Sequence, residues 1–287
     1  MKFRLHKTMN HIQKFCVIVL FLLVTFAASS QRSYRHNALS RSELGFMVGG
    51  SYYIGDLNQK HFNHTNLAAQ LLYRYNFNAR LALRINFTYG KVEGYDSEQK
   101  EAAYVNRNLS FQTQIFELGS GVEITYFPFE LGNKRYRGTA YLLGEFALSR
   151  INPKADYNGS LVELQPLATE GQGSSLSDRK KYSKVQFAVP LAVGVRISLG
   201  DKVGLNFEYG IRFLVTDYLD DVGAYRYADP TLLAAENGPT SAALSNRSLD
   251  GNRFGQRGNR ATRDWYTFFG AGLVFKLGGK NRCPSDF

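Results

Sequence analysis

The stretch "VQFAVPLAVGVRISLGDKVGLNFEYGIRFLV" (residues 185–215) decides the fold. In Val185–Leu199 every odd position is apolar, whereas the even positions are small or polar. The same alternation returns in residues 203–215, where Glu208 and Arg212 lie on the polar face. A period of two is typical of a β-strand, and the intervening "GDK" is short enough for a hairpin turn. The stretch therefore predicts two long antiparallel strands.

Six further segments alternate in the same way, so we predict eight strands of about 10–16 residues, enough to cross a bilayer at a tilt. The eight segments are 44–55, 66–77, 80–89, 112–127, 136–149, 185–199, 203–215 and 265–277. Short and long connections alternate between them. The short ones fall near 78, 128–135 and 200–202, and the long ones span 56–65, 90–111, 150–184 and 216–264.

This pattern predicts an all-β protein, a closed antiparallel eight-stranded transmembrane β-barrel of the outer-membrane type. Closure is expected because lipid offers no partner to the backbone groups of an open sheet edge. The alternative is a secreted β-sandwich or lipocalin-like barrel, in which the apolar face would point inward. Against it, the strands exceed the usual 5–6 residues or so of soluble sheets. The polar face is also rich in glycine and alanine rather than uniformly charged.

The charged residues on the polar face nearly balance, which indicates a lumen filled by ion pairs. They are Arg74, Arg84, Glu117, Glu123, Arg137, Glu145, Arg196, Glu208 and Arg212. An eight-stranded barrel has room inside only for side chains. Unpaired charges would be costly there, so we expect these residues to pair with one another and to plug the lumen.

The first 30 residues have the features of a secretory signal peptide. Four cations and no acid precede a 12-residue apolar run, Phe15–Phe26, and small residues follow it. Removing residues 1–30 leaves 31 cations against 24 acids, a net charge of +7, and one cysteine, Cys283. We expect a periplasmic segment at 31–43, the barrel at 44–277 and a periplasmic tail at 278–287.

A cluster of acids marks one mouth of the predicted barrel. With an even strand count and both termini in the periplasm, the first and seventh strands end outside the cell. Asp56 follows the first strand, and Asp217, Asp220 and Asp221 follow the seventh. Their spacing does not fit the acids, glycine and final glutamate of a helix–loop–helix calcium site. We expect these acids to accept hydrogen bonds from loop backbone, with an ion or external partner as the open alternative.

No catalytic, cofactor or metal site is predicted. The sequence lacks G-x-S-x-G, H-E-x-x-H and P-loop patterns, and His61 and His64 alone are too few ligands for zinc. Basic runs in the long loops, Arg179–Lys184 and Arg253–Arg263, suggest attraction to lipopolysaccharide phosphates as an alternative to simple solvation. We expect no nucleic-acid partner.

Several motifs resemble a known family. "GFMVGGSYYIGDLN" (Gly45–Asn58) closely resembles the first strand of the PorG-like barrels of type IX secretion. "YFPF" (Tyr126–Phe129), "TDYLDDV" (Thr216–Val222) and the "CP" of the tail (Cys283–Pro284) are also similar. The resemblance covers essentially the whole mature chain, except that nothing is transferred onto Leu232–Gly258.

The resemblance implies a non-enzymatic role in the outer membrane. PorG-like proteins anchor a periplasmic ring, made of a lipoprotein and its partner (PorK and PorN), for the machine that exports cargo and in some bacteria supports gliding. We hypothesise that Cys283 reaches a ring subunit through an intermolecular disulfide, with a free thiol as the alternative. Two other functions remain open: a small barrel whose loops bind surface ligands, and a lipid-modifying barrel enzyme.

Overall fold

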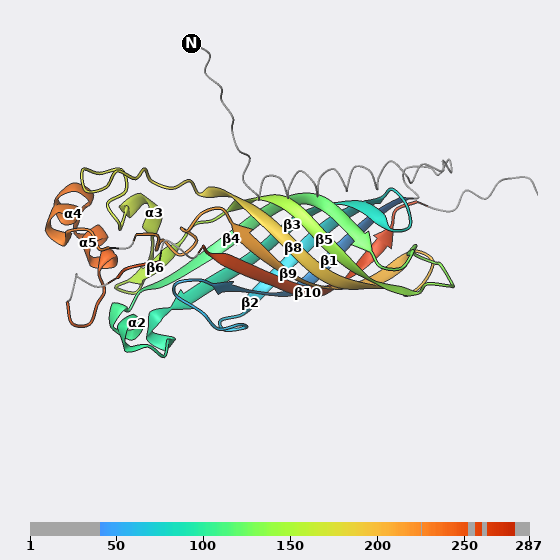
Figure 1. Ribbon diagram of the computed structural model, residues 1–287, viewed down its shortest axis with the longest axis horizontal. Coiled ribbons are helices and arrows are strands. Elements are labelled where there is room, and N and C mark those ends of the chain that lie inside the picture. Colours follow the sequence, from blue (N-terminus) through green and yellow to red (C-terminus); the bar gives the residue numbers. More distant parts are fainter. Residues whose placement is uncertain (1–40, 225, 252–255, 260–262, 279–287) are drawn as a thin grey trace, which may run out of the picture. The chain divides into compact units, whose positions relative to one another are not determined.

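The computed structural model describes residues 41–224, 226–251, 256–259 and 263–278, all within one compact unit, Ala38–Phe287. In this unit eight long antiparallel strands form a closed barrel (Figure 1). They are β1 (Ser42–Ile54), β2 (Asn66–Asn76), β3 (Leu81–Tyr95), β4 (Ser110–Thr125), β5 (Gly138–Arg150), β8 (Val185–Ser198), β9 (Val203–Leu214) and β10 (Trp265–Lys276). The predicted eight-stranded barrel is confirmed. The predicted signal peptide, 1–30, and residues 31–40 lie outside the described residues.

Closure comes from pairing of the first and last strands. β1 pairs with β10 from Glu43↔Lys276 to Ile54↔Trp265, and its other edge pairs with β2. β3 joins β4 over its whole length, so the circle β1–β2–β3–β4–β5–β8–β9–β10 is complete. Every strand of the barrel therefore has a neighbour on both sides, and no barrel edge is left unpaired.

The two faces of the wall are arranged inside out compared with a soluble barrel. On β8 the side chains of Phe187, Leu191 and Val193 point outward and are 67%, 51% and 52% exposed. The alternate residues point inward, and Arg196 is only 2% exposed. An apolar outer surface around a polar interior is the arrangement of transmembrane barrels. The soluble sandwich and the lipocalin-like barrel are therefore excluded.

The connections separate by length at the two ends of the barrel (Figure 1). The short turns, 77–80, 126–137 and 199–202, lie at one end, together with the start of β1 and the end of β10. At the first turn, Asn78 Oδ1 accepts hydrogen bonds from the backbone N–H groups of Arg80 and Leu81, at 2.8 and 2.9 Å. This side-chain turn explains why the chain reverses so tightly there.

The long connections lie at the opposite end and hold more structure than the alternation predicts. They contain η2 (Asp96–Glu98), α2 (Ala102–Arg107), β6 (Lys154–Tyr157), β7 (Ser160–Glu163), α3 (Leu164–Leu167), α4 (Pro230–Asn237) and α5 (Pro239–Ser245). Among the described residues, no helix combines the length and the apolar character needed to cross a membrane.

The third strand also runs further than predicted, to Tyr95 instead of residue 89. Lys91 and Glu93 occupy outward positions in this part of β3 and interrupt its apolar face, so the alternation is not visible in the sequence. Gly90 and Gly94 lie on the inward face, against neighbours that leave little room for a side chain. A Cβ atom would come within 2.8 Å of Ser51 Oγ at Gly90, and within 3.0 Å of the Phe111 ring at Gly94.

Candidate functional site

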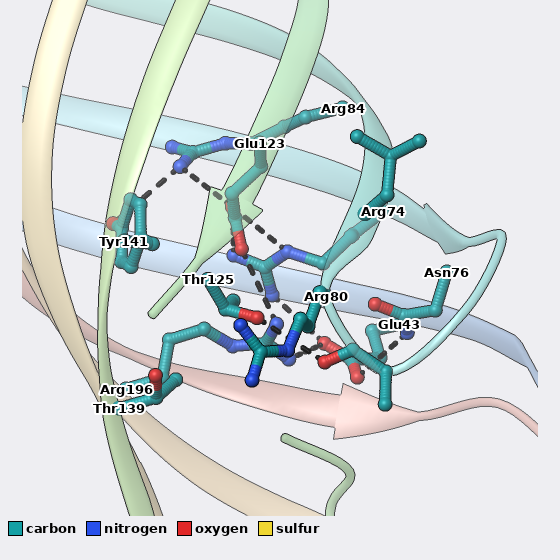
Figure 2. A network of polar contacts seen from close by, with 12 residues as sticks. Glu43, Arg74, Asn76, Arg80, Arg84, Glu123, Thr125, Thr139, Tyr141 and Arg196 are labelled. Carbon is teal, nitrogen blue, oxygen red and sulfur yellow. Dashed lines mark hydrogen bonds and ion pairs between the residues drawn. The ribbon is translucent and has the colours of Figure 1, made fainter. Parts of the chain in front are cut away.

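The lumen contains a buried network of arginine and glutamate side chains. Figure 2 shows Arg74, Arg84 and Arg196 converging on Glu123 and Glu43 near the short-turn end. The Arg74 guanidinium lies 2.8 Å from Glu43 and 2.7 Å from Glu123. Arg196 lies 2.5 Å from Glu43 and 3.2 Å from Glu123. The two carboxylates therefore hold the side chains of β2, β3 and β8 together across the barrel.

The network continues toward the loop end through Arg84 and Glu208, whose nearest charged atoms are 2.5 Å apart. Tyr141 also donates to Glu208, at 2.7 Å. Further along the lumen, Glu117 accepts a short hydrogen bond from the Tyr266 hydroxyl and lies 3.5 Å from Arg212. Polar side chains thus occupy the interior along the length of the barrel.

The structure brings together eight of the nine residues predicted for the lumen. Seven of these eight form ion pairs with one another. The eighth, Glu145, accepts instead from Asn86 at 2.6 Å, and among the described residues no guanidinium lies within 4 Å of it. Arg137 is the exception: it is exposed, because β5 begins one residue later and Arg137 belongs to the preceding turn.

The sequence reading missed Glu43. The first strand is irregular in its alternation, and its predicted start at residue 44 left this acid outside the barrel. In the structure Glu43 is 3% exposed, pairs with Arg74 and Arg196, and also accepts from Asn76 at 2.9 Å. Its sequence signal was its position two residues before Gly45, on the inward-facing register of β1.

The turn 126–137, called the floor here, closes the lumen at the short-turn end. Its apolar residues Phe129 and Leu131 are 3% and 5% exposed. The guanidinium carbon of Arg196 lies over the Phe129 ring, 4.5 Å from its centre. The floor therefore packs directly beneath the ion-pair network.

Hydrogen bonds attach the floor to the other turns. Phe129 N–H donates to the Ala79 carbonyl at 2.7 Å, and Gly132 N–H donates to Ser198 Oγ at 3.0 Å. Glu130 on the floor lies 2.9 Å from Lys276 at the end of β10. Since β10 lies across the barrel from β4, the floor spans the opening rather than hanging from one edge.

The long connections form the corresponding closure at the loop end, called the cap here. Buried apolar side chains from the connections pack on the ends of the strands in one cluster. Its members include Tyr53, Leu57, Leu109, Phe111, Ile151, Leu164, Leu214, Leu219, Val222, Leu244 and Tyr266. Because apolar burial is the main driving force for ordering such segments, the cap is a packed layer rather than a set of separate loops.

Two acids meet inside the cap: Asp220, which was predicted at the mouth, and Asp264, which was not. The Tyr53 hydroxyl donates to Asp220 at 2.6 Å and to Asp264 at 2.8 Å. Asp264 also accepts from Leu219 N–H at 3.0 Å, and Asp220 from Val222 N–H at 2.9 Å. Burial, with the other carboxyl nearby, raises the pKa of Asp220 well above its usual range. Burial raises the pKa of Asp264 to about 7.

Asp221 belongs to a second buried group in the cap. It accepts from the Tyr182 hydroxyl at 2.7 Å and from the Thr169 hydroxyl. Arg257 lies 3.9 Å from Asp221 and forms a short ion pair with Glu170. Burial raises the pKa of Asp221 to about 6 although Arg257 opposes this. The group ties the β5–β8 connection to the β9–β10 connection.

The remaining mouth acids lie beside these groups. Asp56 accepts from Asn259 N–H at 2.7 Å, as expected for an acid that shapes a loop. Asp217 is half-buried, and burial together with the nearby Asp264 and Asp56 raises its pKa to about 8. The four predicted mouth acids therefore all lie at the loop end, and Asp56, Asp220 and Asp221 accept hydrogen bonds from the cap and from the adjoining end of β1.

Most of the basic run Arg179–Lys184 is also used within the cap. Arg179 donates to the Tyr218 hydroxyl at 2.5 Å and to the Gly223 carbonyl at 3.0 Å. Lys181 donates to the Pro166 carbonyl at 2.7 Å, and Lys184 lies 2.6 Å from Glu163. Lys180 is exposed. In the second basic run Arg257 is buried, while Arg253 and Arg260 lie outside the described residues.

No metal centre is found in the part of the chain that the structure describes. His61 contacts the Tyr52 hydroxyl at 3.1 Å, and His64 lies 2.6 Å from Glu98. Each histidine therefore has its own local partner, and they do not share a site. Cys283 and residues 279–287 of the predicted tail lie outside the described residues.

Comparisons with known proteins give one family model and several similar solved structures. The model of a family described as "Domain of unknown function (DUF6089)" matches residues 13–230. No curated protein sequence matches the chain. Its structure is similar to Neisserial surface protein A (TM-score 0.43, 10% identity, 83% of this chain and 97% of that one covered). It is also similar to Ail of Yersinia pestis (0.39, 10%, 82% and 97%) and OprG of Pseudomonas aeruginosa (0.31, 10%, 82% and 93%).

Proposed function

Because this chain belongs to the family described as "Domain of unknown function (DUF6089)", its role has to be argued from its own residues, and we propose a sealed, non-enzymatic anchor in the outer membrane. The observation that carries this proposal is the blocked lumen. Ion pairs fill the interior, the floor closes one end, and the cap closes the other. A barrel built this way is suited to holding other proteins at the membrane rather than to passing solutes.

The outer surface supports the location. Large apolar side chains project from all eight strands, and examples from different sides of the barrel are Phe46, Leu71, Phe87, Leu118, Phe146, Phe187, Phe207 and Leu273. Such a continuous apolar band is stable in lipid and would be unfavourable in water. We place the long connections outside the cell and both chain ends, with the short turns, in the periplasm, as is usual for outer-membrane barrels.

The finer proposal is a role in type IX secretion. Its support is the resemblance of Gly45–Asn58 and Thr216–Val222 to PorG-like barrels. On this proposal the short-turn end anchors a periplasmic ring lipoprotein and its partner, similar to PorK and PorN. Cys283 is a candidate for the contact.

Purification of the barrel from its host tests this role. An affinity tag in the exposed β6–β7 turn at Gly159 leaves the short-turn end and both chain ends unchanged. We expect the ring lipoprotein and its partner to co-purify from detergent extracts, and not from untagged cells. A Cys283→Ser variant on a non-reducing gel then shows whether a disulfide contributes, because its loss would remove a high-molecular-weight band. Recovery of the barrel alone under mild extraction would contradict the role in type IX secretion.

The sealed lumen has a separate test. Liposomes that contain the purified barrel should retain small sugars as well as empty liposomes do. Efflux comparable to that through an open porin would contradict the anchor proposal, whatever co-purifies.

Binding of lipopolysaccharide through the basic loops has less support, because Arg179, Lys181 and Lys184 already have partners within the cap.

A further inference from the structure

We propose that the underside of the floor is a docking face for an acidic surface of a periplasmic protein. The inference rests on the proposed function, because it needs the short-turn end to face the periplasm. It adds the location of the contact, the residues that make it and the charge of the partner. Three observations support it: the charge of this end, the absence of partners for that charge, and the rigidity of the floor.

The short turns carry an excess of exposed positive charge. Their exposed charged side chains are five cations, Arg80, Lys134, Arg135, Arg137 and Lys202, and two acids, Glu130 and Asp201. One of the two acids, Glu130, already pairs with Lys276. The exposed side chains of the described short turns therefore carry a net charge of +3, and an excess of positive charge attracts and orients an oppositely charged partner.

The five cations have no acidic partner among the residues that the structure describes. None of them forms an ion pair within the described residues, and their side chains make no hydrogen bond there. The Arg135 guanidinium lies over the Tyr136 ring, 5.4 Å from its centre, a contact that leaves its charge exposed. Their charge is available to a molecule outside the barrel.

Three of these cations, Lys134, Arg135 and Arg137, belong to the floor, whose backbone is held in place. The rings of Phe127 and Tyr136 stack with their centres 5.7 Å apart, which joins the two ends of the turn. Leu131 also packs against Gly204 of β9, where a Cβ atom would come within 2.6 Å of the leucine. A preordered surface loses less conformational entropy on binding than a mobile loop does. This rigidity favours a binding surface over a solvated turn.

The position of the floor favours a protein over lipid head groups. The floor crosses beneath the lumen from the β4–β5 edge to Lys276 of β10, on the far side of the barrel. Lipid head groups surround the barrel and reach only its perimeter. A protein docked from below covers the whole end and reaches the cations of all three turns at once.

The purified full-length barrel in nanodiscs of zwitterionic lipid, with soluble poly-L-glutamate as the probe, tests the charge. We expect binding that weakens between 0.1 and 1 M salt, as the Debye length shortens from about 10 to about 3 Å. The triple variant Lys134→Glu, Arg135→Glu, Arg137→Glu should bind at least about tenfold more weakly. The charge-conserving variant Lys134→Arg, Arg135→Lys, Arg137→Lys should bind normally.

A matched control separates this face from general positive charge. Lys100 and Lys180 are exposed cations of the cap, so Lys100→Glu with Lys180→Glu changes charge at the other end. Equal loss in the control and the triple variant would overturn the proposal, as would no binding by the unmodified barrel. Loss of probe binding when anionic lipid is added to the nanodisc would assign the cations to head groups and also overturn it.

Labelling in cells distinguishes failure of this proposal from failure of the proposed function. In a Cys283→Ser background, Asn133→Cys on the floor should react with an impermeant maleimide only after the outer membrane is opened. Ser160→Cys in the exposed β6–β7 hairpin should react in intact cells. Reaction of Asn133→Cys in intact cells would overturn the orientation, and the proposed function with it. Protection of Asn133→Cys without probe binding would overturn the docking face alone.

Discussion

At the loop end, Arg107 and Arg257 are buried, and a buried carboxylate, Asp96 or Glu170, holds each of them. At the short-turn end, Lys134 and its two arginine neighbours are exposed and pair with no acid in the described part of the chain. Removing one partner of a buried pair costs about 3–5 kcal/mol, whereas exposed pairs contribute about 1 kcal/mol or less. Arg107 and Arg257 at the loop end therefore stabilise the fold, whereas Lys134, Arg135 and Arg137 at the short-turn end form no such pairs within the described residues.

The contrast shows that basic residues in the connections at the two ends of the barrel have different roles. The cap buries its charges because four long connections must be held in one packed layer, and each arginine crosslinks two or more of them. The floor has one charged link, the Glu130–Lys276 pair, and is otherwise fixed by hydrogen bonds and two buried apolar side chains. What remains charged and exposed there is free to serve a partner.

The largest effect on stability is expected in the lumen, which contains buried ion pairs like those of the cap. Glu123 forms ion pairs with Arg74, Arg84 and Arg196. The Glu123→Ala substitution therefore removes one carboxylate partner from each of these three guanidinium groups. We expect a loss of about 3–5 kcal/mol in the free energy of unfolding, measured by urea titration in vesicles. Glu130→Ala, which removes an exposed acid of the floor, is the control and should cost less than about 1 kcal/mol. Equal losses would show that the network is not structural.

A local effect is expected in the cap. Arg257→Met removes the cation between Glu170 and Asp221 and leaves the Glu170 carboxylate buried with Arg179 3.8 Å away. We expect cleavage of the long connections by protease to become at least about tenfold faster, which corresponds to about 1.4 kcal/mol, while the barrel remains intact on gels. The exposed Arg226→Met is the control. Unfolding of the whole barrel in Arg257→Met would contradict a separate role for the cap.

The sequence predicted the strands of the barrel well, because the pattern that defines a strand is local. Alternation along each strand depends only on neighbours two residues apart, so Val185–Leu199 assigned both faces of β8 without knowledge of the rest of the chain. The same logic assigned Arg84, Glu123 and Glu208 to the lumen. It failed for Arg137, because a turn boundary shifted by two residues moves a side chain from the inside to the outside.

The cap and the floor were beyond this kind of prediction. Arg257 pairs with Glu170, 87 residues away, and Tyr53 with Asp264, 211 residues away. No periodicity links such positions, since loop packing brings them together. The acids after the seventh strand looked alike in sequence, yet Asp220 and Asp221 entered two different buried groups. Likewise, nothing local indicated that Phe129 and Leu131 would close the lumen.

A smaller effect is the dependence of stability on pH, which we expect from the buried acids of the cap and not from the exposed acids of the short-turn end. The pKa of Asp264 is raised to about 7 in the cap from an ordinary value of about 3.8. The folded state therefore holds a proton that the unfolded chain releases. Stability contributed by this group falls as pH rises from about 4 to about 7 and then stays level. Asp221 acts in the same direction up to about pH 6 and Asp217 up to about pH 8.

Trp265 is the only tryptophan and directly follows Asp264, so its fluorescence reports on this region. We expect the urea midpoint at pH 5 to exceed that at pH 8, with a smaller difference in Asp264→Asn. Asp201→Asn, at an exposed acid of the short-turn end, should behave like the unmodified protein. A midpoint that rises with pH would contradict the raised pKa values of the buried acids.

The smallest effect compares single arginines from the two ends. Arg179 donates to the Tyr218 hydroxyl and the Gly223 carbonyl and lies 3.8 Å from Glu170, so Arg179→Ala should lower the free energy of unfolding by about 1 kcal/mol. The Arg135 guanidinium contacts the face of the Tyr136 ring. The Arg135→Ala substitution should therefore change the free energy of unfolding by less than about 0.5 kcal/mol. Both are measured from urea titrations followed by Trp265 fluorescence. A loss at Arg135 as large as that at Arg179 would mean that the cations of the floor also stabilise the fold. Their exposure would then no longer argue for a partner.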